Sequence, residues 1–219
     1  LTDFTIAQMR ALRILSSDTE GEYPCRPCDE EQPTRNTMVL GEGAAMLALE
    51  RLAPDELAYR EDRQRAERGE APAGSVLARI IGAGFSVEAV ETNTSVSEEG
   101  TALRHSMRQA LGRAGLDTVD VIVTHTPGTA LGDRAELNAI RRLFGSRTPV
   151  LTSNKWLLGH TLGASAVLGV EYALFILRHQ RWVDYPYRVP FTNAPCQVRT
   201  VMVNSVGFGG NAASLILTR

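Results

Sequence analysis

Cysteine is scarce in this chain, with only three among 219 residues. Cys25 and Cys28 have the C-x-x-C spacing of zinc and redox sites, but no second pair completes a metal site, and Cys196 stands alone. The scarcity excludes a disulfide scaffold and favours a reducing, cytoplasmic location. We therefore interpret Cys25 and Cys28 as incidental thiols in a polar loop and expect no metal site.

The chain also lacks an excess of charge of one sign. It has 23 Lys and Arg and 25 Asp and Glu, which gives a net charge of −2. Nothing in this balance indicates a nucleic-acid partner. The first residues lack the charged and apolar regions of an export signal. The most apolar segment, residues 161–177, is shorter than the roughly 20 residues of a membrane span and contains Glu171. We interpret it as a buried helix, packed closely on all sides, and expect no membrane partner.

The chain also lacks a recognisable nucleophile turn, that is, a tight turn that presents a catalytic Cys or Ser. The chain has three glycine-bearing loops instead. The first contains His125, the second contains Lys155 and His160, and the third spans residues 204–211. Catalytic groups are often found in such loops when a rigid sheet positions them.

Apolar periodicity and turn residues predict alternating strands and helices, and hence an α/β layered fold. The expected helices are residues 4–15, 54–70, 100–115, 133–144 and 160–179. The expected strands are residues 38–49, 75–85, 119–124, 149–152, 198–205 and 213–217, the last two forming a pair around a glycine turn. The Pro- and Gly-containing residues 71–74 favour a boundary between 1–74 and 75–219.

Several stretches carry a resemblance to a known family: residues 7–12, 39–45, 132–140, 155–160, 163–165 and 204–210. In this order the chain resembles the C-terminal part of the β-ketoacyl-acyl-carrier-protein synthases, which are condensing enzymes of the thiolase fold. The resemblance implies a thiolase-like layered α/β fold, with residues 1–74 as the tail of the N-terminal half and residues 75–219 as the C-terminal half. It also implies that the nucleophilic cysteine lies upstream, because no cysteine of this chain falls at the family's position.

His125 and His160 match the family's two catalytic histidines. During decarboxylation, negative charge develops on a thioester oxygen, which two neutral imidazoles can stabilise by donating N–H bonds. We place His160 at the start of the helix 160–179, where the helix dipole disfavours an imidazolium. Spacing alone is equally compatible with structural histidines in loops. His105 and His179 match no motif and are interpreted as surface residues.

Lys155 and Glu136 match the family's lysine and the acidic residue that accompanies it. A lysine near a carboxylate stays charged and can orient the histidines through its fixed charge. The alternative is a surface salt bridge of little energetic value. We interpret Asp133 as the cap of the helix 133–144 and favour Glu136 for the active-site role.

Three further residues are candidates for substrate binding. Phe208 matches the family's gating aromatic, Gly209 adds a backbone N–H to an oxyanion hole, and Thr129 matches a threonine that holds the phosphopantetheine arm. The chain departs from the family pattern at Pro127, which stands at another threonine position, and at Val206, where a second phenylalanine is common.

The sequence thus predicts a β-ketoacyl synthase acting by decarboxylative Claisen condensation on acyl-carrier-protein thioesters, with its nucleophilic cysteine outside this chain. The alternatives are a non-catalytic subunit resembling chain-length factors and a thiolase. No cofactor is expected beyond the phosphopantetheine carried by the acyl carrier protein. The expected partners are that carrier protein and an N-terminal half or partner subunit carrying the cysteine, in a homodimer or heterodimer.

Overall fold

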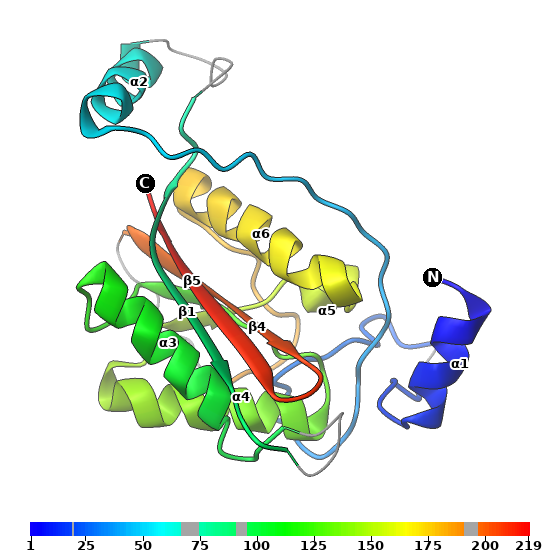
Figure 1. Cartoon of the computed structure of the whole chain (residues 1–219). Helices are drawn as coiled ribbons and strands as arrows, with labels where there is room; N and C mark the ends of the chain where they lie inside the picture. The colour runs from blue at the N-terminus through cyan, green and yellow to red at the C-terminus, as the bar shows by residue number, and fades with distance from the viewer. Residues whose placement is uncertain (19, 67–74, 91–95, 191–196) are drawn as a thin grey trace.

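A five-stranded mixed sheet forms the centre of the molecule. The structure is a computed structural model that describes residues 1–18, 20–66, 75–90, 96–190 and 197–219. The strands lie in the order β1-β5-β4-β2-β3, of which Figure 1 labels β1, β5 and β4. Their bounds are β1 Arg79–Val87, β2 Val121–Val123, β3 Val150–Thr152, β4 Thr200–Gly207 and β5 Asn211–Thr218. β2 runs parallel to β3 and β4, whereas β5 is antiparallel to both β4 and β1. The expected α/β class and the hairpin around a glycine turn are confirmed.

Helices cover both faces of the sheet (Figure 1). α3 (Thr101–Ala114) and α4 (Ala130–Phe144) pack on one face, and α6 (Ser165–His179) packs on the other. The strand residues alternate accordingly, since Ile122 packs with α3 and α4 while Val121 and Val123 pack with α6. The short strands β2 and β3 are buried throughout, as expected for strands covered on both sides.

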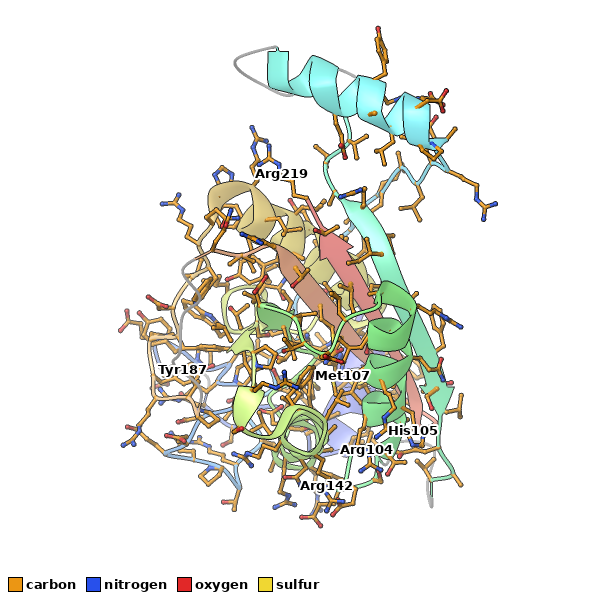
Figure 2. All side chains as sticks on the ribbon, turned by 90° about the vertical axis from the view of Figure 1, so that its left-hand side faces the viewer. Arg104, His105, Met107, Arg142, Tyr187 and Arg219 are labelled. Carbon is orange, nitrogen blue, oxygen red and sulfur yellow. The ribbon has the colours of Figure 1, made fainter. Side chains whose placement is uncertain are left out.

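The expected helix at residues 100–115 is confirmed as α3, which ends at Gly115 in a left-handed conformation that satisfies the last carbonyl groups. Leu103, Met107 and Ala110 lie on its buried side, whereas His105 is exposed. Figure 2 shows Met107 and His105 on different sides of this helix. His179 is also exposed, so both histidines lie on the surface as expected.

The apolar segment after residue 160 does not form one helix. A short helix α5 (Lys155–Leu158) and a 3₁₀ turn (Leu162–Ala164) precede α6. Residues 162–179 are long and apolar enough to cross a membrane, with a mean hydropathy of 1.2. In this structure 28% of them are buried. Gly169, Ala173 and Ile176 face the sheet. The expectation that this helix is packed on all sides is therefore wrong for the described part of the chain, because only its sheet-facing side is buried.

The expected strand at residues 38–49 is also wrong. Only single bridges form there, from Met38 to Leu15 and from Leu40 to His160, and residues 42–50 are exposed. An alternating apolar run forms a strand only beside another strand, and no strand of the described residues lies next to this run. Figure 1 shows it as an extended connection between α1 (Asp3–Ala11) and α2 (Pro54–Ala66).

α1 is shorter than the expected helix at 4–15. α2 is the charged helix expected from residue 54 onward, and its side chains at residues 54–61 are mostly exposed. The expected boundary at residues 71–74 lies outside the described residues, as do the end of the second helix at residue 70 and Cys196.

Candidate active site

The candidate site lies at the carboxyl ends of the three parallel strands. His125 comes shortly after β2, Lys155 comes shortly after β3, and Asn204 lies within β4. Because these strands are parallel neighbours, the segments that follow them meet at one edge of the sheet. A cavity of about 510 Å³ opens there, and its lining includes His125, His160, Glu136, Thr129 and Phe208. The structure therefore brings together residues from all three glycine-bearing loops.

His125 and His160 lie side by side in this cavity. Their ring centroids are 5.2 Å apart with an angle of 81° between the planes, and each residue is only 8% exposed. His160 does not open the long helix, as the sequence predicted, because α6 begins at Ser165. Its position is set instead by Gly159, whose φ of +74° would strain a side chain, and by a bridge between His160 and Leu40.

The hydrogen bonds of His160 determine which ring nitrogen carries its proton. The Leu162 backbone N–H donates to Nδ1 at 3.0 Å, and the Ser165 hydroxyl lies 3.3 Å from the same atom. Nδ1 is therefore an acceptor, and in the neutral ring the proton is on Nε2. His160 is consequently prepared to donate one hydrogen bond from Nε2.

Both histidines are held neutral by their surroundings. Burial, followed by the Lys155 charge, lowers the pKa of His160 to about 4. Burial also lowers the pKa of His125 well below its usual value, with further contributions from Lys155 and His160. The predicted neutral state thus has support in burial and a neighbouring cation rather than in a helix dipole.

Lys155 is only 4% exposed, and its charge acts on both histidines. Its Nζ donates to the Thr124 carbonyl oxygen at 3.4 Å. Burial lowers its pKa to about 8, opposed by the negative charges of Glu136 and Asp133. A surface salt bridge is ruled out because both Lys155 and Glu136 are buried, and no ion pair between them occurs in the described part of the chain.

Glu136 extends from α4 and holds the backbone that carries His125. Its Oε1 accepts the His125 N–H at 3.1 Å and its Oε2 accepts the Thr126 N–H at 2.7 Å. The Asn204 amide donates to Oε1 at 2.9 Å. Burial raises the pKa of Glu136, while these hydrogen bonds and Lys155 lower it. The carboxylate therefore fixes the position of the loop after β2.

The interpretation of Asp133 as a helix cap is wrong. α4 begins at Ala130, with Thr129 as the N-cap accepting the Gly132 N–H at 3.2 Å, because the Thr129 hydroxyl lies one turn earlier. Asp133 is buried and accepts the backbone N–H groups of Cys28 at 2.8 Å and Gly128 at 2.9 Å. Burial raises its pKa to about 7. Asp133 thus connects two loops that are distant in the sequence.

The interpretation of Cys25 and Cys28 as incidental thiols stays a prediction. Their loop contacts Asp133 through the Cys28 backbone N–H, and Cys25 is 3% exposed. Burial raises the pKa of Cys25 to about 11 and that of Cys28 well above its usual value. Because the thiolate is the reactive form, both thiols are poor nucleophiles near neutral pH.

The predicted binding residues lie around the cavity opening. Phe208 is 54% exposed at the turn of the β4–β5 hairpin and lines the cavity with Val206 and Pro127. Thr129 lines it as well and retains a hydroxyl hydrogen for a ligand. Gly209 is not among the described lining residues, so its role stays a prediction.

Sequence reasoning missed three polar residues behind the site. Asn204 was recognised only as part of a glycine loop, although its amide contacts Glu136. Ser106 and Ser214 gave no signal, because a single serine within a helix or strand does not reveal from sequence alone which residues it contacts. Sequence reasoning also missed the apolar wall of the cavity, which includes Met9, Ile14, Leu103, Leu131 and Leu162.

Comparison with known proteins decides the family. Residues 77–185 match the β-ketoacyl synthase C-terminal domain. A 3-oxoacyl-[acyl-carrier-protein] synthase 2 of Rhizobium meliloti is 30% identical over 98% of this chain and 51% of its own length. The chain belongs to the β-ketoacyl synthase family. It spans about half the length of the curated relatives it matches and corresponds to their C-terminal portion.

Solved β-ketoacyl synthases share the fold. A synthase from Burkholderia phymatum superimposes with a TM-score of 0.75 at 30% identity, covering 100% of this chain and 52% of that one. The ishigamide ketosynthase/chain length factor superimposes with a TM-score of 0.78 at 26% identity, covering 100% of this chain and 51% of that one. The thiolase-like layered α/β fold is therefore confirmed.

Proposed function

We propose that this chain supplies the decarboxylation machinery of a β-ketoacyl synthase that acts on thioesters of an acyl carrier protein. The observation that supports it most is the pair of buried, neutral histidines at the carboxyl edge of the sheet, 5.2 Å apart, with the proton of His160 placed on Nε2. The name of the Rhizobium meliloti relative supports the carrier protein as the partner.

In this mechanism the carbonyl oxygen of a malonyl thioester accepts hydrogen bonds from His125 and His160. The bond between the α-carbon and the carboxylate breaks, carbon dioxide leaves, and the electron pair forms an enolate stabilised by both imidazoles. The α-carbon then attacks an acyl-cysteine thioester, forming the new carbon–carbon bond and releasing the cysteine thiolate. Lys155 favours neutral imidazoles through its charge, and Glu136 holds the His125 backbone in place.

The acyl-cysteine comes from outside this chain in the proposal, because no cysteine here stands at the family's nucleophile position and burial raises the pKa of Cys25 and Cys28. An N-terminal half or a partner subunit would provide it, in a homodimer or heterodimer. The chemistry requires no metal or dissociable cofactor, since the phosphopantetheine arm arrives on the carrier protein. A cytoplasmic location belongs to the same proposal.

The test measures carbon dioxide release from malonyl thioester by the full-length polypeptide. His125→Ala and His160→Ala are each expected to lower the rate about 100- to 1000-fold, as removal of an oxyanion-stabilising donor does. His105→Ala, at an exposed helix position, is the matched control and should leave the rate unchanged. Undiminished release from both cavity variants would exclude the proposal.

The second candidate is a non-catalytic subunit resembling a chain-length factor, because one similar structure is named as a ketosynthase/chain length factor. The two candidates differ in covalent loading. A synthase incubated with an acyl thioester of the carrier protein gains the mass of the acyl group on a cysteine, whereas a chain-length factor does not.

A further inference from the structure

We propose that Asn204 is a positioning residue for the Glu136 carboxylate, and that the buried hydroxyls of Ser214 and Ser106 hold its amide in the required orientation. The link from this arrangement to catalysis rests on the proposed function. The arrangement itself rests on a continuous set of hydrogen bonds through the core.

The orientation of the Asn204 amide follows from its two neighbours. Its Nδ2 lies 2.9 Å from Glu136 Oε1 and 3.4 Å from the sulfur of Met107, and its Oδ1 accepts the Ser214 hydroxyl at 2.8 Å. The reverse orientation would place Oδ1 against the carboxylate, where two acceptors repel. In this orientation Asn204 donates to Glu136 and accepts from Ser214, so both neighbours favour the same side of the amide.

The direction of the remaining hydrogen bond follows by counting protons. Each serine hydroxyl donates one hydrogen, and Ser214 already uses its hydrogen on Asn204. Any hydrogen bond across the 2.9 Å contact between the two serine oxygens is therefore donated by Ser106, which shares its one hydrogen between Ser214 and the Leu103 carbonyl oxygen at 2.9 Å. The hydrogen bonds run in one direction, from Ser106 to Ser214, to Asn204 and to Glu136.

Packing alone does not account for the two serines. Ser106 lies on the buried side of α3 among Leu103, Met107 and Ala110, and both serines are 0% exposed. A hydroxyl in such a core is costly unless it is hydrogen-bonded, whereas alanine at the same place would carry no such cost. A role in satisfying and orienting Asn204 explains why hydroxyls are present there.

The hydrogen bonds end at the backbone of a catalytic histidine. Glu136 accepts from the N–H groups of His125 and Thr126, so its rotation would release the loop after β2. The charged groups facing Glu136 are Lys155, from the segment after β3, and Asp133, from α4 itself, with the Cys28 thiol nearby. We expect these groups to stay in place when Asn204 or Ser214 is changed, because neither residue is their hydrogen-bond partner.

The experiment compares Asn204→Leu, Ser214→Ala and Ser106→Ala in the full-length polypeptide. A lost hydrogen bond to a charged carboxylate raises its pKa. Asn204→Leu is therefore expected to move the acidic limb of the decarboxylation pH profile upward by about one unit and to lower kcat about tenfold at neutral pH. The KM for the malonyl thioester should change little. Ser214→Ala should cause a smaller shift in the same direction, and Ser106→Ala a smaller one still.

Thr200→Val is the matched control. Thr200 is the first residue of the strand that contains Asn204, and its hydroxyl donates to Asp120 at 3.0 Å. This variant loses a hydrogen bond and some stability without touching the site, so its pH profile should match the wild type. If the Asn204→Leu variant does not fold, the Ser214→Ala profile decides the question by itself.

A second readout does not depend on activity. Infrared difference spectra recorded across pH report the protonated carboxyl band of Glu136, assigned by its loss in Glu136→Gln. The inference predicts that this band appears at higher pH in Asn204→Leu and Ser214→Ala. The inference is overturned if the wild type is active and the variants keep both its pH profile and its carboxyl band. The proposed function would remain supported in that case. A shifted band in a polypeptide without decarboxylase activity supports the positioning of Glu136 and overturns the proposed function.

Discussion

His160 connects local geometry to the pH dependence of folding. Its pKa is lowered to about 4 in the folded protein, whereas an unfolded histidine titrates near 6.5. As the pH falls from 6.5 to 4, the unfolded chain takes up a proton that the folded chain does not, so stability falls over this window. The shift corresponds to at most about 3 kcal/mol.

We therefore expect His160→Gln to lose less stability than the wild type when the pH is lowered from 7 to 5. Urea unfolding at both pH values measures this difference. Asp133, whose raised pKa acts in the opposite direction, is present in both proteins and cancels in the comparison. Equal pH dependence in the two proteins would contradict the prediction.

The residues of the site were predictable from sequence to different degrees. His125, His160, Lys155 and Glu136 stand in motifs with a fixed order, and the structure brings them to one edge of the sheet. The contacts of Asp133 with Cys28 and of Asn204 with Glu136 join positions far apart in the chain. A single sequence contains no signal for such contacts, because either partner alone is compatible with many environments.

At the level of elements, the close approach of β1 to α3 depends on Gly84. A Cβ atom at this position would lie 1.9 Å from the Ser106 carbonyl oxygen. We expect Gly84→Ala to push the strand from the helix and to destabilise the protein by about 1–3 kcal/mol, as overpacking does. Thermal or urea unfolding measures the loss.

Gly112, on the exposed side of the same helix, is the control for this prediction. A Cβ at Gly112 meets no atom within 4 Å, so Gly112→Ala should stabilise α3 by about 1 kcal/mol through helix propensity. If Gly84→Ala and Gly112→Ala changed the stability equally, the prediction would be contradicted. The change would then come from the loss of backbone freedom rather than from packing between β1 and α3.

Elements with their own local signals were predicted well. α3 has an amphipathic pattern and a terminal glycine, and the β4–β5 hairpin surrounds a glycine turn. Residues 38–49 have the apolar content of a strand, but a strand also needs a neighbour, which the sequence pattern does not reveal. α6 was predicted as an apolar helix, yet the extent of its burial depends on tertiary packing.

Across the whole molecule, large apolar side chains remain exposed in several places, and two of these bear on association. Met46 and Leu49 are 95% and 74% exposed before α2, and Phe85 and Val87 are 61% and 69% exposed on the edge strand β1. Exposed apolar surface of this kind promotes association. We expect the 219-residue chain, expressed alone, to self-associate in size-exclusion chromatography with light scattering.

The double variant Met46→Ser and Leu49→Ser should self-associate less, because it removes the larger of these exposures. A monodisperse wild-type monomer that binds no hydrophobic dye would contradict the prediction.

Residues that come before and after His125 in the chain hold its loop in place. Asp133 links this loop to Cys28, and Glu136 links it to Asn204. β2 likewise lies beside β4, although many residues separate them. Contacts between residues so distant in sequence form slowly, since a long loop must close first. During synthesis on the ribosome, this histidine therefore remains without its full support until Asn204 has been made and β4 has joined the sheet.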